Sequence, residues 1–266
     1  MNSNSQPIKL FLVVALSCTS LLASLTPVLA KPTPNRSDTK TILAQAKTFN
    51  QPPIPAGSPP GGRVRGGAKR GEPGCPTPKI DLTALVPFTQ EANSVINVWG
   101  QTTVEHPSWF FYVPYTKNSP YTVEFVLQDQ DDNEVYKKAI ALPNKPGVIR
   151  VSLPSNAPGL AVDTQYRWFF TINCDKEKNA PPSFVEGVIK RVNLSQPTVK
   201  EIETAEPLKR YVIYAQNGIW YEALTTLAEL RQQNPQDAAL KAEWQNLLGS
   251  IRLDDVAGEP VLPGTP

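Results

Sequence analysis

Few side chains in this sequence could carry out chemistry. His106 is the only histidine among 266 residues, so a catalytic triad or a histidine-based metal centre would have to use it. No GxSxG elbow, HExxH motif or glycine-rich strand-to-helix loop supports such a role. The carboxylates that could form a glycosidase pair or a calcium site have the spacing of a turn and its flanks: Glu105, Glu124, Asp129, Asp131, Asp132 and Glu134. We therefore expect no catalytic residue, no metal and no cofactor.

Cysteine chemistry is the exception. Cys18 lies in a segment that we expect to be removed, which leaves Cys75 and Cys174 as an even pair. In an oxidising compartment such a pair predicts a disulfide. The alternative is two free cysteines, one buried and one on a loop. Two thiols and one histidine are too few ligands for a structural zinc site.

The N-terminus has the pattern of a signal peptide over residues 1–30. Lys9 precedes an uncharged, mostly apolar run from Leu10 to Leu29, and Ala30 ends a site that suits signal peptidase. We expect export and cleavage after Ala30. A retained membrane anchor and a lipoprotein modified at Cys18 are the alternatives. Removing Lys9 from the 26 basic residues leaves 25 against 24 acidic ones, a balance that predicts no nucleic-acid partner.

Residues 31–79 have the composition of a disordered leader. Proline and glycine dominate residues 51–74, and no apolar period is present, so this segment could bury too little surface to fold. Its basic side chains outnumber the one acid, Glu72: Arg63, Arg65, Lys69 and Arg70. We expect either a solvated linker or a basic tether that touches an anionic surface, such as lipid headgroups or a wall polymer. Any membrane contact would be made by this leader.

Short strands separated by turn residues fill residues 80–196. Apolar residues alternate with polar ones over 121–128, the acidic run Asp129–Glu134 is typical of a hairpin turn, and further strands are predicted at 108–115, 135–142, 148–153 and 184–192. This pattern predicts an antiparallel β-sandwich of the immunoglobulin or fibronectin-III type. In such domains a tyrosine near the start of a strand bonds back to nearby backbone, and Tyr166 has this position. It shares one face with Trp168, Phe170, Ile172 and Cys174.

The apolar period becomes helical over residues 197–257. Thr198 or Thr204 could cap a helix that runs to Gln216, Gly218 would end it, and Pro235 suits the first turn of a third helix after one at 219–233. The offsets resemble one tetratricopeptide-type hairpin: Tyr214, Gly218, Trp220, Ala223 and Pro235. The alternative is a helical appendage packed on the sandwich. Residues 258–266 are expected to form an unstructured tail.

Large aromatic side chains are the candidate binding residues: Trp109, Tyr112, Trp220, Tyr221 and Trp244. Phe110 and Tyr112 must point away from Trp109 and Phe111, because neighbouring residues of a strand face opposite sides. Their side of the strand is either a second buried surface, for example under the helices, or an exposed patch for a ligand. A solvent-facing Trp109 or Trp99 would favour sugar binding, whereas an apolar groove along the helices would favour a protein.

Several segments together resemble an exported cyanobacterial family catalogued as domain-of-unknown-function nine-two-eight: LTALVP (82–87), SWFFYVPY (108–115), VEFVLQD (123–129), YRWFFTINCD (166–175), VEGVIKR (185–191) and NGIWYEALTTLAELR (217–231). The resemblance runs from about residue 60 to the end. It implies a cyanobacterial source and a periplasmic, outer-envelope or thylakoid-lumen location, and no catalytic residues. We therefore expect a non-catalytic binding or scaffolding module of the cell envelope. Its partner would be a protein or, alternatively, a cell-wall polysaccharide such as peptidoglycan.

Overall fold

The computed structural model describes residues 49–55, 57, 61–66, 75–175 and 180–263, all within one compact unit. The predicted signal peptide (1–30), Cys18, Lys69 and Arg70 lie outside these residues. None of the helices in the described part is long and apolar enough to cross a membrane.

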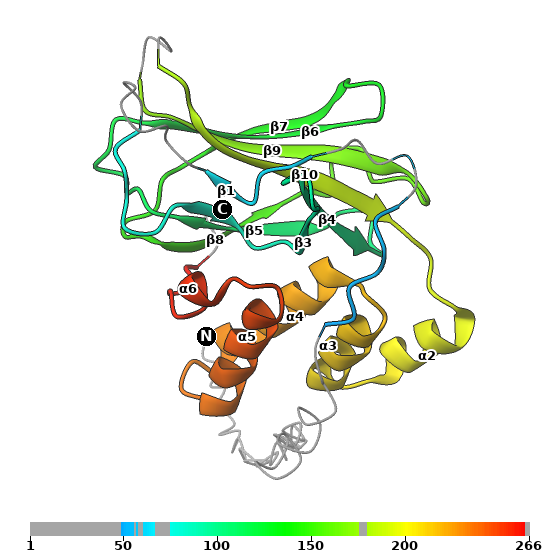
Figure 1. Ribbon diagram of the computed structural model, residues 1–266. Coiled ribbons are helices and arrows are strands. Elements are labelled where there is room, and N and C mark those ends of the chain that lie inside the picture. The colour runs from blue at the N-terminus through cyan, green and yellow to red at the C-terminus, as the bar shows by residue number, and fades with distance from the viewer. Residues whose placement is uncertain (1–48, 56, 58–60, 67–74, 176–179, 264–266) are drawn as a thin grey trace, which may run out of the picture. The chain divides into compact units, whose positions relative to one another are not determined.

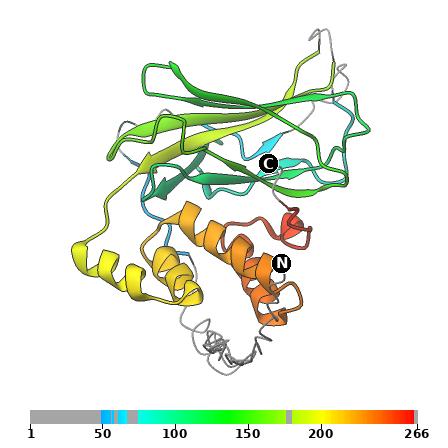
Figure 2. The ribbon, with the colours of Figure 1, turned by 180° about the vertical axis from the view of Figure 1, so that it is seen from behind.

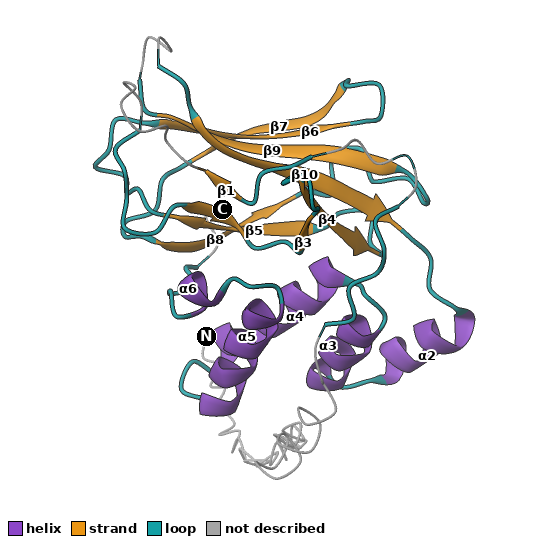
Figure 3. Cartoon of the chain, viewed as in Figure 1, coloured by secondary structure: helices purple, strands orange, loops and turns teal. Residues whose placement is uncertain are grey.

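Two β-sheets form the first part of the fold (Figure 1). One sheet has four strands in the order β1 (Arg65–Gly66), β2 (Leu82–Ala84), β5 (Ser108–Val113) and β8 (Gly147–Ser152). The other has six strands in the order β3 (Phe88–Gln90), β4 (Ile96–Thr102), β10 (Ser183–Arg191), β9 (Gln165–Asn173), β6 (Thr122–Gln128) and β7 (Glu134–Ile140). Helices follow the strands along the chain, as predicted (Figure 3).

The sheets are not wholly antiparallel, so this detail of the prediction is wrong. β4 and β10 run parallel, with Val188 opposite Trp99 and Arg191 opposite Thr102. Antiparallel neighbours can be joined by a tight turn, but parallel neighbours need a long connection. Strands β5 to β9 separate these two in the chain, so no turn imposes an antiparallel arrangement on them.

The sandwich core lies between the two sheets. The predicted alternation is confirmed in β6 and β9, where every second side chain is buried. Phe111 of β5 stacks on Phe170 of β9 with 4.3 Å between ring centroids, and Trp168 meets Phe111 edge-on at 5.7 Å. Gly187 in β10 leaves room for that indole, because a Cβ there would lie 2.5 Å from the Trp168 ring. The backbone N–H of Ala161 donates to the Tyr166 hydroxyl at 3.0 Å, which confirms the predicted local hydrogen bond.

Five helices are present among the described residues: α2 (Gln196–Thr204), α3 (Pro207–Gln216), α4 (Trp220–Gln233), α5 (Ala238–Ser250) and α6 (Asp254–Ala257). They lie on one side of the sandwich, which Figure 2 shows from behind. Gly218 ends α3 as predicted. With φ at +73° it allows its own N–H to reach Ala215 O and that of Ile219 to reach Tyr214 O, which pairs the last carbonyls of the helix.

Two predicted helix boundaries are wrong. A start at Thr198 for the helix that runs to Gln216 is wrong, because α2 and α3 are two separate helices there. Pro207 cannot continue a helix and instead occupies the first turn of α3, close to the alternative start at Thr204 just ahead of it. α2 is capped by Ser195, whose hydroxyl accepts from the Thr198 N–H. The third predicted helix begins after Asp237 instead of at Pro235, since the Asp237 carboxylate accepts from the N–H groups of Ala239 and Leu240.

Parts of the leader and of the tail also belong to the fold, contrary to the prediction. β1 of the leader pairs with β2, and Arg63 exchanges backbone hydrogen bonds with Glu186. In the tail, Val148 donates to Pro260 O and accepts from the Leu262 N–H, so residues 260–262 extend the edge at β8. Backbone pairing of this kind does not need the apolar periodicity that both segments lack.

Candidate functional site

The disulfide between Cys75 and Cys174 is confirmed, with 5.0 Å between the α-carbons. Cys75 lies on the chain that leads into β2, and Cys174 directly follows β9. The bond therefore joins chain segments of the two different sheets.

The five aromatic residues predicted to bind a partner are all buried, with at most 5 % of each side chain exposed: Trp109, Tyr112, Trp220, Tyr221 and Trp244. This prediction is wrong, because Trp109 packs between the sheets against Phe125 of β6, while Trp220 and Tyr221 of α4 pack against the sandwich. Trp99 is buried as well. The aromatic side chains thus build the core that joins the sandwich to the helices.

That junction centres on the first turn of α4. The Trp220 indole N–H donates to the Leu85 carbonyl at 2.8 Å, and its ring meets Phe49 edge-on at 4.8 Å. Tyr221 packs 5.9 Å from Trp109, measured between ring centroids. Gly100 of β4 permits this approach, because a Cβ there would lie 3.0 Å from the Tyr221 ring.

A carboxylate is buried in the same junction. Glu222 accepts hydrogen bonds from the Thr102 hydroxyl at 2.5 Å and from the Thr103 N–H at 3.2 Å. Burial outweighs these bonds and raises the pKa of Glu222 to about 7. A raised pKa also marks many catalytic acids. Here the carboxylate links α4 to the end of β4, because each of its two oxygens accepts one of these hydrogen bonds.

We expect the protein to become less stable as pH rises from about 5 to 8. The pKa of Glu222 is about 7 in the folded chain against an ordinary value of 4.5, so between these values the folded state binds more protons than the unfolded one. Its contribution is fully present below pH 4.5 and is lost as pH rises through 7, at a cost of up to about 3 kcal/mol. Urea unfolding at several pH values measures this slope.

Glu222→Gln should flatten the slope, and Glu229→Gln on the exposed side of α4 should leave it unchanged. Some slope will remain in the first variant, because burial also raises the pKa of Glu243, which accepts a hydrogen bond from Tyr211. An identical slope in Glu222→Gln and the parent protein would show that this carboxylate is not the cause.

The other predicted chemical groups are separated and satisfied locally. His106 Nε2 lies 3.1 Å from the Ala157 carbonyl. The Asp129 carboxylate accepts from the Asp131 N–H and from both the backbone and the side chain of Asn133, and the Asn133 bonds lower its pKa. The predicted hairpin turn between β6 and β7 is thereby confirmed. Glu105 and Glu124 form ion pairs with Arg191 and Lys137 respectively, so they do not face each other as a catalytic pair.

Two of the leader's basic side chains are also engaged within the fold. Arg65 makes two hydrogen bonds of 2.7 Å to Asp255 and lowers the pKa of that carboxyl group, while Arg63 lies 4.5 Å over the Phe184 ring. Arg63 and Arg65 are therefore engaged inside the fold, and the alternative in which the leader is a basic tether to an anionic surface stays a prediction.

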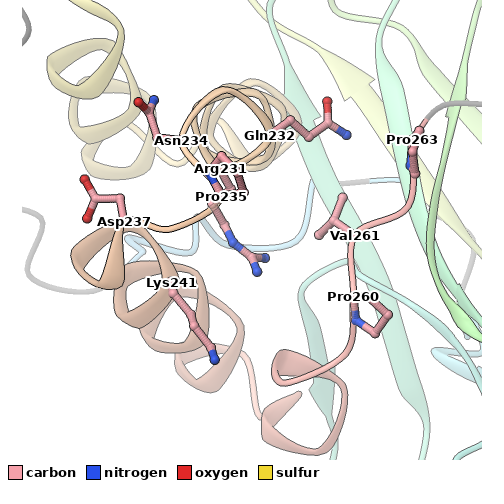
Figure 4. A pocket seen from close by; sticks show the side chains of 9 residues that line it. All are labelled: Arg231, Gln232, Asn234, Pro235, Asp237, Lys241, Pro260, Val261 and Pro263. Carbon is pink, nitrogen blue, oxygen red and sulfur yellow. The ribbon is translucent and has the colours of Figure 1, made fainter.

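A pocket of about 590 Å³ lies between the turn that joins α4 to α5 and the tail segment 260–263 (Figure 4). It is lined by Arg231, Gln232, Asn234, Pro235, Asp237, Lys241, Pro260, Val261 and Pro263. Figure 4 shows the Arg231 side chain reaching from α4 into the space beside α5, with the Asp237 carboxylate turned away from it. Sequence reasoning missed this site, since its residues come from three separate segments and match no motif.

The cations of this pocket are not neutralised by the described part of the chain. The half-buried Arg231 guanidinium lies 4.8 Å over the Trp244 ring, and its Nη1 is buried without a hydrogen-bond partner there. Lys241 is exposed and forms no ion pair with any residue that the structure describes. The pocket can therefore offer positive charge to a ligand.

Comparison with known proteins gives the family but no activity. A crystal structure of Parabacteroides merdae β-glucuronidase aligns with a TM-score of 0.22 and 12 % identity, over 66 % of this chain and 34 % of that one, which is too weak to carry an argument. Among curated proteins no sequence matches. The model of one family, Domain of Unknown Function (DUF928), matches residues 65–261. That match covers most of the sequence and the elements from β1 to α6, and the chain belongs to the DUF928 family.

Proposed function

We propose that this chain is an exported, non-catalytic binding and scaffolding module of the cell envelope, and that its partner is a protein. The observation that supports the proposal is the pocket beside the α4–α5 turn, where Arg231 and Lys241 form no ion pair with any residue that the structure describes. Helices and sandwich share one hydrophobic core, so this pocket is presented by a continuous folded body. Preformed pockets with a few convergent polar groups are the usual form of a ligand site.

Export is supported by the disulfide. Bonds such as Cys75–Cys174 persist in oxidising compartments and are rare in reducing ones. Together with the signal-peptide pattern of residues 1–30, this favours a location outside the cytoplasm. The resemblance to an exported cyanobacterial family favours three locations for the protein: the periplasm, the outer envelope or the thylakoid lumen of a cyanobacterium.

The finer fold description is also a proposal. The hydrogen bond to Tyr166 supports an immunoglobulin- or fibronectin-like sandwich. The turn at Gly218 between α3 and α4 supports a tetratricopeptide-like hairpin, although α4 packs on β4 and β5 and therefore serves here as a cover for the sandwich. Such folds host many functions, so they support binding only by analogy.

A protein partner is favoured over a wall polysaccharide. Sugar-binding modules of the kind considered above need exposed, flat aromatic rings. All tryptophan and tyrosine side chains in the described part of the chain are buried or half-buried. The candidate pocket instead offers charge and proline-rich walls.

The test is affinity capture with the chain from Lys31 onward as bait and an envelope extract of the source organism as input. We expect the bait to enrich proteins that an unrelated bait does not enrich. Three variants each reverse one charge at a different place on the surface, and one of them should no longer capture these proteins: Lys117→Glu, Lys138→Glu and Lys241→Glu. Deleting the helices is unsuitable, because it would expose the core under Trp220. Equal enrichment by all variants and the unrelated bait contradicts the proposal. A hydrolytic activity that is lost in His106→Ala or Glu222→Gln contradicts its non-catalytic part.

A further inference from the structure

We infer that the pocket beside the α4–α5 turn binds a carboxylate group on an acidic segment of the partner protein. The inference rests on the proposed function and specifies its chemistry. Arg231 is the central group. It is half-buried against Trp244, and within the described residues it makes no ion pair and no hydrogen bond through Nη1.

An unpaired, partly desolvated guanidinium is costly, and an anionic ligand would offset the cost. Burial lowers the pKa of Arg231, which reflects the same desolvation. Stacking on the indole also restricts the planar group before a ligand arrives. A fixed planar fork suits the two oxygens of a carboxylate and loses little freedom on binding.

The charge of the pocket favours a single carboxylate over a dianion. Arg231 and Lys241 supply two positive charges, and Asp237 supplies one negative charge at the rim. The Asp237 carboxylate is held by the first N–H groups of α5, so it does not swing over to neutralise Arg231. The pocket therefore has a net charge of about +1. A carboxylate neutralises this charge, whereas a doubly charged phosphate would leave the occupied pocket negative.

The walls favour a peptide as the carrier of that carboxylate. Pro235, Pro260, Val261 and Pro263 line the pocket beside the cations. The tail wall is already held in place, because Val148 pairs with both Pro260 and Leu262. A wall that needs no ordering lowers the cost of binding an extended segment.

The experiment uses two capped six-residue peptides, one with a single glutamate between prolines and the other with glutamine in its place. Inorganic phosphate is the third probe. The readout is the Nε–Hε NMR signal of Arg231 in the full mature chain, assigned from its absence in Arg231→Lys. We expect the glutamate peptide to shift this signal and the glutamine peptide to leave it unchanged.

Affinity for the glutamate peptide should fall on the order of tenfold or more in Arg231→Gln, the range of a lost charge-assisted hydrogen bond. Lys241→Gln should cause a smaller fall, since Lys241 contributes charge from the exposed rim. Arg63→Gln is the matched control, because Arg63 also stacks on a ring, that of Phe184, but lies outside the pocket. It should bind like the parent protein.

Equal binding of the two peptides, stronger binding of phosphate, or no shift at millimolar peptide would overturn the inference. A shift of the Arg231 signal on removal of residues 264–266, in a sample without peptide, would also overturn the inference. The pocket would then be occupied by the chain itself. The outcome is separable from that of the proposed function. If capture succeeds and every partner is retained by Arg231→Gln, only the carboxylate site fails.

Discussion

Replacing Trp220 with alanine should lower the free energy of unfolding by about 3–5 kcal/mol, the range for deleting a fully buried tryptophan. Trp220 is the side chain through which α4 enters the core of the sandwich. It packs on Phe49 and hydrogen-bonds to Leu85 beyond β2. Its loss removes apolar contacts and leaves the Leu85 carbonyl unpaired inside the protein. Urea unfolding followed by circular dichroism measures the change.

Trp220→Phe separates the two contributions. Phenylalanine keeps most of the packing but cannot donate, so we expect a smaller loss of about 1–3 kcal/mol for the unsatisfied Leu85 carbonyl. Ile54→Ala, at a side chain that is 37 % exposed, is the control and should change little. If Trp220→Ala costs less than about 1 kcal/mol, well below the range for buried aromatics, helices and sandwich do not depend on a shared core.

Local patterns in the sequence were sufficient to predict the strands that face a single core. The alternation in β6 and β9 arises because one side of each strand is buried and the other is not. β5 differs, since all six of its residues are buried. Its sequence shows that Phe110 and Tyr112 face away from Trp109 and Phe111, but it leaves open whether their side is buried or exposed. The helices lie about 100 residues later, and no local signal shows that they pack there.

The candidate site was less predictable for a similar reason. Arg231 and Trp244 belong to different helices, and only the turn at Asn234–Pro235 is visible in the sequence. That Arg231 has no acidic partner among the described residues follows from the folded arrangement and not from the local sequence. Glu222 is a partial exception, because it lies directly between Tyr221 and Ala223 in a helix start that is buried on all sides. A charged residue in so apolar a turn is a signal that sequence analysis could use.

Removing the disulfide should have an effect as large as that of Trp220→Ala. For Cys75→Ala/Cys174→Ala we expect a loss of about 4–5 kcal/mol in the free energy of unfolding, the chain-entropy value for a loop of this length. The two cysteines are 99 positions apart, so the bond restricts much of the unfolded chain. It also ties the segment entering β2 to the end of β9 in the opposite sheet. Urea unfolding of the oxidised parent and of the double variant measures the difference.

The reduced parent protein is the control, because it keeps both side chains and loses only the bond. We expect its stability to match that of the double variant within about 1 kcal/mol, the typical effect of a conservative substitution. If the double variant is much less stable than the reduced parent, packing at Cys75, which is buried, contributes more than the cross-link. If both are as stable as the oxidised protein, the two sheets are held together by their aromatic core alone. The disulfide then has no measurable part in stabilising the fold.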